Sequence, residues 1–295
     1  NASNAERDLA WLQAVASKQV QLDPENPSAE IEGEVEILDL KDPSSGDLRL
    51  VDLAFQGPRA LDVLNRLIDS PTQARTLRVL KRFETAQGDL AGIRCLIAMT
   101  GYTGEPIGYE IYVHPDALVD LWNAILEQGE PFGVQRCGLG ARDSTRTEAG
   151  FPLHGQELAG PQQITPIEAG YGAFVKLHKP FFIGRTAMRH NEENRTMDIV
   201  RFRVKDQGVR MVRTGDPIAN RRGVIIGWVT SSTQVEGEQI GMAYLQKRES
   251  KPGNQCSVFR LPKPAQSPKE LPKHEVQPGD SALTSEKIEI LPRFW

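Results

Sequence analysis

Residues 100–110 read Thr-Gly-Tyr-Thr-Gly-Glu-Pro-Ile-Gly-Tyr-Glu and join a glycine-rich turn to the start of a strand. The alternation from Tyr109 to Val113 has a period of two, which predicts that Glu110 and Tyr112 lie on one face of that strand. Tyr102 lies in the turn, off the alternating strand, so core packing alone does not account for it. The stretch therefore predicts a sheet with a polar face and an aromatic side chain beside it.

A second informative stretch starts at residue 138, where residues 138–143 read Gly-Leu-Gly-Ala-Arg-Asp and open a predicted helix over 139–149. Arg142 and Arg146 lie four residues apart in this helix and so share one face. A solvated ion-pair network is the commoner explanation of such a pair, and a binding site is the alternative. The opening resembles a dinucleotide fingerprint, but the third glycine and a strand directly before it are missing, so dinucleotide binding is the weaker interpretation.

Patterns on both sides of these stretches complete a mixed α+β half. Ser3 and Glu6 have the spacing of a capping box ahead of a helix, whose apolar stripe consists of Leu9, Leu12, Val15 and Ala16. Gly57-Pro58 is typical of a helix start, because proline is tolerated in the first turn. The other elements predicted in this half are strands at 35–38, 50–55, 77–83 and 93–99 and a helix over 115–128.

Beyond residue 180 the helix signals become weak and short β-like runs take over. Such runs predict a separate all-β domain, a barrel or a sandwich. A proline-rich polar stretch over 261–285 predicts a long exposed excursion. The predicted strands are at 199–204, 224–230, 240–245, 256–261 and 288–291.

The composition is that of an ordinary globular protein of about two domains, with 39% hydrophobic and 25% charged residues in a chain of 295. A net charge of -4 supplies no basic field for a nucleic acid. No apolar run approaches the roughly 18 residues that span a bilayer. We expect a monomer without a nucleic-acid or membrane partner, in the cytoplasm, or in the mitochondrion in a eukaryote.

Several kinds of chemistry have no signature in the sequence. The motifs HExxH, GxSxG, GK[ST] and CxxC are absent, and the five histidines lack metal-ligand spacing, so neither a metal nor a protein nucleophile is expected. Three widely spaced cysteines do not form a disulfide framework, which favours a reducing compartment.

The two informative stretches together resemble the aminomethyltransferase family, the T-protein of the glycine cleavage system and its relatives. Residues 100–105 and 108–110 are similar to the family's RTGYTGE and G-[FY]-E motifs, and residues 138–157 to its GLGARD-x-x-R-x-EAG and GQE stretch. Flanking segments agree with the family at 1–8, 56–58 and 182–185.

The resemblance implies an α+β fold, a T-protein-like cloverleaf in which mixed α+β folate-binding domains precede a C-terminal all-β barrel-like domain. We expect the folate-binding region over residues 1–178, as two α+β subdomains whose N-terminal part is missing, and the barrel domain over 179–295.

The resemblance also implies a tetrahydrofolate site. Glu110 corresponds to the glutamate that reads the pterin, because a carboxylate accepts hydrogen bonds from an adjacent ring N–H and amino group. Arg142 matches an arginine of the same pocket, Tyr102 the aromatic that flanks the ligand and Asn1 a pterin-contacting asparagine. Arg146 is a further candidate for cofactor binding or a supporting position. The family's catalytic aspartate is expected upstream of Asn1, so no catalytic residue is named.

The implied reaction takes an aminomethyl group from the lipoyl arm of H-protein, releases ammonia and passes the carbon to tetrahydrofolate. Positioning and charge placement supply most of the catalysis. Two alternatives stay open at the level of sequence: a folate-dependent demethylase of a small methylated donor, and a folate-binding protein that performs no transfer.

Overall fold

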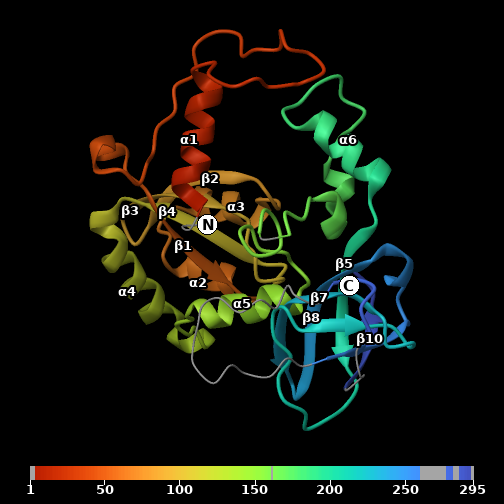
Figure 1. Ribbon diagram of the computed structural model, residues 1–295. Helices are drawn as coiled ribbons and strands as arrows, with labels where there is room; N and C mark the ends of the chain where they lie inside the picture. Colours follow the sequence, from red (N-terminus) through yellow and green to blue (C-terminus); the bar gives the residue numbers. More distant parts are fainter. Residues whose placement is uncertain (1–3, 161, 260–276, 282–285, 294–295) are drawn as a thin grey trace. The chain divides into compact units, whose positions relative to one another are not determined.

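The computed structural model describes residues 4–160, 162–259, 277–281 and 286–293 (Figure 1). The chain divides into two units, one made of residues 36–142 and the other of residues 1–35 with 143–295. The boundary expected between residues 178 and 179 stays a prediction.

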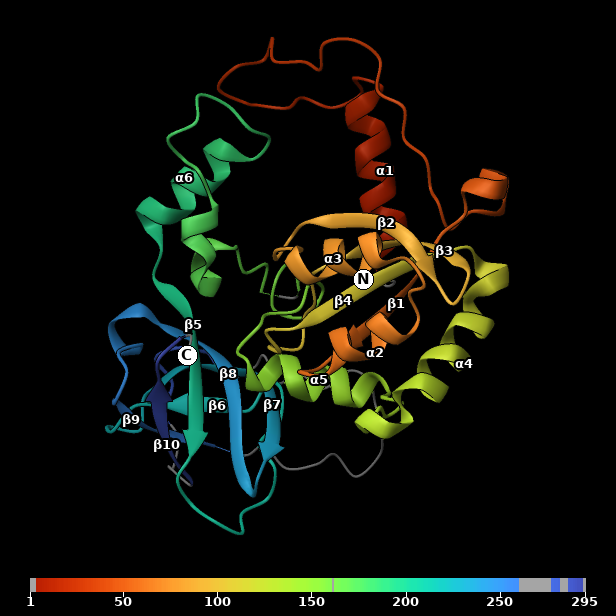
Figure 2. The ribbon, with the colours of Figure 1, turned by 180° about the vertical axis from the view of Figure 1, so that it is seen from behind.

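The unit of residues 36–142 is built on an antiparallel sheet with the strand order β1-β4-β3-β2. The strands are β1 (Val51–Gln56), β2 (Thr85–Leu90), β3 (Ile93–Ala98) and β4 (Gly108–Val113), and the helices are α2 (Ala60–Arg66), α3 (Pro71–Val79) and α4 (Leu118–Gly129). In β4, Tyr109, Ile111 and Val113 are buried in a core shared with Leu64 and Leu121 from the helices. The helices therefore cover one face of the sheet (Figure 2), as its alternating pattern requires.

Two predicted strands of this unit are wrong. Residues 77–83 do not form a strand, because α3 begins at Pro71, where the Ser70 side chain accepts a hydrogen bond from Gln73 N, and continues to Val79. Residues 35–38 form no ladder with any described residue, and Val35 and Leu38 are exposed. Apolar residues without a pairing partner do not make a strand.

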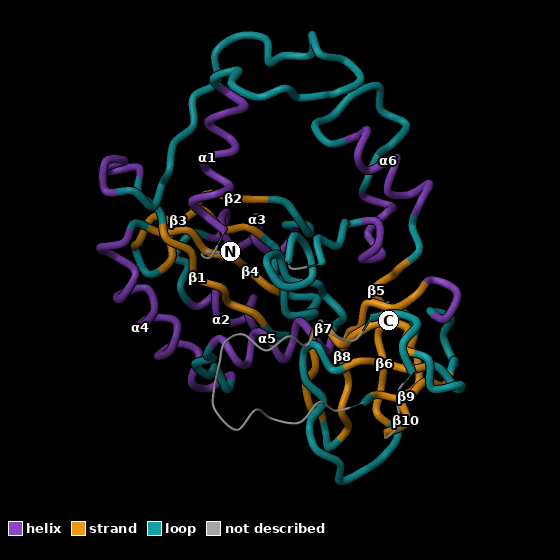
Figure 3. The backbone as a smooth tube through the Cα atoms, in the orientation of Figure 1, coloured by secondary structure: helices purple, strands orange, loops and turns teal. Residues whose placement is uncertain are grey.

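The second unit contains a closed barrel with the strand order β10-β5-β8-β7-β6-β9 (Figure 3), which confirms the predicted barrel-like domain. Its interior includes Phe202, Ile226 and Leu245. The longest hairpin turns at Glu236-Gly237, where both residues have positive φ (50° and 86°), as a tight two-residue turn requires. The strands are β5 (Met197–Val204), β6 (Pro217–Ala219), β7 (Ile225–Val235), β8 (Glu238–Gln246), β9 (Gln255–Val258) and β10 (Glu286–Leu291).

Helices α1 (Ala5–Ala16) and α6 (Arg185–Asn194) belong to this unit. Helix α5 (Leu139–Glu148) begins in the unit of residues 36–142 and ends in this one. The N-cap of α1 is Asn4, one residue after the expected Ser3, which lies outside the described residues. Helix α6 was not predicted, because it is almost entirely polar and has no apolar stripe. Most of the expected excursion over 261–285 also lies outside the described residues. Among the described helices, none has the length and apolar character that crossing a membrane requires.

Candidate functional site

The face of the sheet opposite α2, α3 and α4 carries a small group of polar side chains, and we call it the polar sheet face. Glu110 and Tyr112 project there from β4, since their neighbours in the strand face the helices. The Tyr112 hydroxyl donates a hydrogen bond to Glu110 Oε2 at 3.5 Å. Asp52 on β1 is the direct cross-strand partner of Tyr112, and Ala54 is that of Glu110. The period of two predicted for this strand is therefore confirmed.

Opposing charges act on the Glu110 carboxyl. Burial and the negative charge of Asp52 raise its pKa, whereas the hydrogen bond from Tyr112 and the positive charge of Arg142 lower it, and the net direction is upward. Arg142 extends from α5 and is exposed. The structure thus brings the charge of Arg142 within reach of Glu110, although 32 residues (142 - 110) separate them in sequence.

Gln56, at the end of β1, organises the glycine-rich turn. Its side-chain nitrogen donates to the carbonyl oxygens of Thr100 and Tyr109, both at 3.1 Å, and its side-chain oxygen accepts from Thr103 Oγ1 at 3.2 Å. A Cβ atom added at Gly101 would overlap the Gln56 amide. A larger residue at this position would therefore displace the Gln56 amide from its hydrogen bonds.

Replacement of Gln56 with alanine should destabilise the protein by about 1–2 kcal/mol, because the carbonyls of Thr100 and Tyr109 lose a shared donor. The urea midpoint of unfolding, followed by circular dichroism, measures the effect. Gln87→Ala is a matched control, since Gln87 is exposed and accepts only a long 3.5 Å hydrogen bond from Arg94. Equal midpoints for the two variants would contradict the role given to Gln56.

Arg146 has surroundings unlike those of Arg142, one turn earlier in α5. Arg146 is 0% exposed, and its guanidinium donates to Glu157 Oε2 at 2.9 Å and to Ser231 Oγ at 2.9 Å. Further donations reach Asp143 Oδ1 at 2.8 Å and Gln156 Oε1 at 3.1 Å. Arg146 therefore joins the helix, the loop after it and barrel strand β7.

The remaining predicted site residues are placed as follows. Tyr102 is half-buried in the turn before β4. The nearby Glu105 donates its backbone N–H to Thr103 Oγ1 at 3.4 Å, a contact that shapes the turn. Asn1 lies outside the described residues. No cluster of three or more potential metal-ligating side chains occurs among the described residues.

Sequence reasoning did not single out Gln56 or Asp52 for this face. For Asp52 a signal existed, because a charged residue stands inside an otherwise apolar strand, Val51–Phe55. Its importance depends on the register that sets it opposite Tyr112, and the register is not readable from one strand alone.

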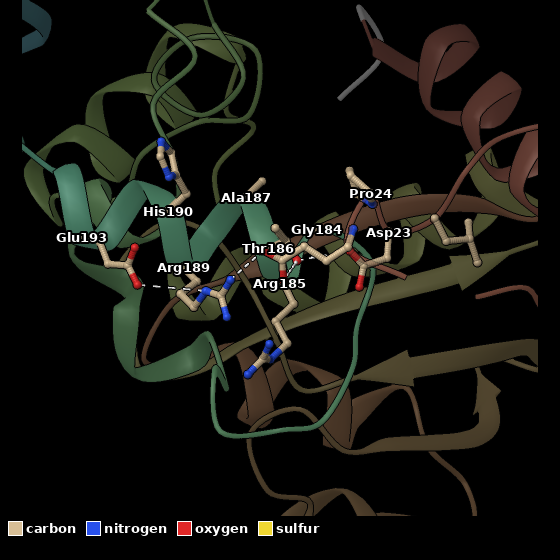
Figure 4. A pocket seen from close by; sticks show the side chains of 11 residues that line it. Asp23, Pro24, Gly184, Arg185, Thr186, Ala187, Arg189, His190 and Glu193 are labelled. Atoms are coloured by element: carbon tan, nitrogen blue, oxygen red, sulfur yellow. Dashed lines mark hydrogen bonds and ion pairs between the residues drawn. The ribbon is translucent and has the colours of Figure 1, made fainter. Parts of the chain in front are cut away.

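A cavity of about 340 Å³ lies elsewhere, between residues 22–25 and the first turns of α6 (Figure 4). Its polar groups already bind one another: Arg189 pairs with Glu25 at 2.7 Å, and the Thr186 hydroxyl donates to Asp23 at 3.2 Å. None of the predicted site residues lines it. The polar sheet face, not this cavity, is therefore the candidate site.

Comparison with known proteins identifies the family of the chain. The family model described as the GCVT N-terminal domain matches residues 1–179. The chain is 35% identical over 268 residues to the aminomethyltransferase of Thermoanaerobacter sp. (strain X514), a match that covers 90% of this chain and 64% of that protein. It is also 35% identical over 266 residues to the aminomethyltransferase of Bacillus subtilis (strain 168), with 88% and 64% covered.

The fold has a solved counterpart in the crystal structure of glycine cleavage system aminomethyltransferase T from Bartonella henselae. The TM-score is 0.62 at 24% identity, over 83% of this chain and 59% of that one. The chain spans 64% of the length of the two curated relatives named above. The family resemblance of its motifs is confirmed, and the chain belongs to the family of the GCVT N-terminal domain.

Proposed function

We propose that this protein is a tetrahydrofolate-dependent aminomethyltransferase, which moves a one-carbon unit from the aminomethyl-lipoyl group of H-protein to tetrahydrofolate and releases ammonia. The observation that carries the proposal is the sheet face with Glu110 and Tyr112, where the positive charge of Arg142 acts on the Glu110 carboxyl, in a chain of this family. The relatives' name, aminomethyltransferase, supports the reaction class.

The residues present fit a pterin. Among the described residues, Tyr112 alone donates a hydrogen bond to the Glu110 carboxylate, at 3.5 Å, so the carboxylate retains acceptor capacity for a ring N–H and an amino group. Arg142 supplies a positive charge that lowers the pKa of Glu110 against the effects of burial and Asp52. When bound, tetrahydrofolate supplies the nitrogen that accepts the carbon unit. We assign Glu110 and Arg142 to hold the ring and Tyr102 to flank it, with Asn1 as a further contact.

Arg146 enters this proposal as a residue that positions α5. Its guanidinium donates to Glu157 and Ser231 and is fully buried. Because the same helix carries Arg142, Arg146 would act on the ligand through the helix. The end of the family match at residue 179 supports a folate-binding region over 1–178 followed by the barrel domain.

Two measurements, made one after the other, test the proposal. Calorimetric titration of tetrahydrofolate into the chain under anaerobic, reducing conditions should show saturable binding. Supplying aminomethylated H-protein should then yield 5,10-methylenetetrahydrofolate and ammonia. Product that carries a methyl group from a small donor would instead establish the demethylase, and binding without turnover with any donor would establish the non-catalytic protein.

Affinity for tetrahydrofolate should rise with pH in the weakly acidic range. Glu110 must be ionised to accept two hydrogen bonds, and its pKa is raised by burial and by Asp52 against the opposing effects of Tyr112 and Arg142. The stability of the protein without ligand should depend on pH in the opposite direction. The folded state holds the Glu110 proton more tightly than the unfolded state, so the contribution of Glu110 to stability falls as pH rises between its ordinary and raised pKa values.

Calorimetry at a series of pH values, with thermal unfolding at each, separates these two trends. An affinity that stays constant as the pH falls from neutral through the ordinary pKa of a glutamate, about 4.3, would show that Glu110 does not accept hydrogen bonds from the ligand. The Glu110→Gln variant should lose the pH dependence.

A further inference from the structure

Asp52 is a second carboxylate on the polar sheet face, and no function described so far uses it. We propose that Asp52 is a specificity-determining residue that recognises the reduced pterin ring, by accepting a hydrogen bond from a ring N–H that the oxidised ring lacks. The proposal rests on the proposed function, because it concerns the same ligand and the same face.

The strand register sets the spacing of the two carboxylates. Asp52 lies directly opposite Tyr112, and Glu110 is two residues from Tyr112 on the same strand. Asp52 and Glu110 are therefore diagonal neighbours on one face of an antiparallel pair, a relation that separates Cα atoms by about 7–8 Å. Two carboxylates at this spacing can accept hydrogen bonds from two donor positions of one bicyclic ring. A ligand with a single donor group would need only one of them.

The Asp52 side chain is available for such a contact. Asp52 is exposed, and its carboxylate accepts no hydrogen bond from any residue that the structure describes. Glu110, by contrast, receives the hydroxyl of Tyr112. Asp52, the second residue of β1, therefore presents an open carboxylate on the same face as Glu110.

The negative charge of Asp52 is felt across this face. It raises the pKa of Glu110 and, after burial and Glu110 itself, that of Tyr112. This arrangement works against anion binding beside Glu110, and it favours a ligand edge that presents several donors. The opposing charge is Arg142, which lowers the pKa of Glu110.

The chemistry of the ring makes such an edge diagnostic of oxidation state. In a tetrahydropterin the two nitrogens of the reduced ring carry hydrogen and donate, whereas in the oxidised pterin the same two nitrogens bear lone pairs and accept. An ionised carboxylate has no hydrogen to donate. Asp52 would therefore attract the reduced ring and repel the oxidised one, while asparagine, which can donate or accept, would tolerate both.

The test compares affinities for tetrahydrofolate and folic acid, by calorimetry near pH 7 under anaerobic conditions, in the wild-type chain, Asp52→Asn and Asp69→Asn. Asp69 is an exposed aspartate of the same unit, in the loop between α2 and α3, so it controls for loss of one negative charge. We expect the wild type and Asp69→Asn to prefer tetrahydrofolate. Asp52→Asn should reduce this preference roughly 10-fold or more, the size of a charge-assisted hydrogen bond.

The ratio of the two affinities is the decisive quantity, since a structural defect would weaken both ligands together. Unchanged thermal unfolding of Asp52→Asn with a reduced ratio supports the proposal. A wild-type protein that binds tetrahydrofolate, with the same ratio in Asp52→Asn, would overturn the role of Asp52 alone. Failure of the wild type to bind either ligand would overturn the proposed function, and the inference with it.

Discussion

Arg146→Ala is expected to destabilise the protein by about 3–5 kcal/mol, the usual effect of removing one partner from a buried ion pair. Glu157 is 0% exposed, and its remaining donors in the part of the chain that the structure describes are Leu153 N, at 2.8 Å, and the Ser231 hydroxyl. Without the guanidinium its charge stays buried and under-compensated. Gln156 and Asp143 lose a donor as well.

The matched control is Arg142→Ala, which removes the same side chain one turn earlier in the same helix. Arg142 is exposed, so its loss should change the free energy of unfolding by less than about 1 kcal/mol. Urea unfolding followed by circular dichroism measures both variants. If Arg146→Ala unfolds at the wild-type midpoint, the buried network around Glu157 does not stabilise the fold.

Glu110→Ala is expected to weaken tetrahydrofolate binding by about 1–3 kcal/mol, which is roughly 5- to 150-fold, because the ligand loses a charge-assisted acceptor. The fold should not be weakened by loss of the charge. Burial and Asp52 both raise the pKa of Glu110, so its ionised form is disfavoured in the folded protein. Binding and stability are therefore predicted to separate in this variant.

Calorimetry and thermal unfolding of the same preparations test this separation. Glu110→Gln keeps the shape and one acceptor and should bind between the wild type and Glu110→Ala. Glu127→Ala, at an exposed position of α4, removes a glutamate of the same unit and should bind like the wild type. Wild-type affinity in a folded Glu110→Ala protein would remove Glu110 from the proposed site.

Much of this protein was readable from local patterns. Strands β1, β3 and β4 and helices α4 and α5 arise from period-two or helical spacing, and the structure confirms them. The strand alternation also placed Glu110 and Tyr112 on one face, because successive side chains of a strand point in opposite directions. Where pattern reasoning failed, at 35–38 and 77–83, β-like residues lacked a partner strand or followed a strong helix cap.

The sequence by itself determined the family, the order of most elements and the polar face that bears Glu110, since each depends on residues close together in the chain. Only the tertiary structure decided that Arg146 is buried while Arg142 is exposed, and that Asp52 joins Glu110. The partners of Arg146 lie up to 85 residues away, at Ser231, and Asp52 meets Tyr112 through strand register. Helical spacing shows that the two arginines share one face of α5. Their burial depends on the side chains that pack against them, and these come from segments distant in the sequence.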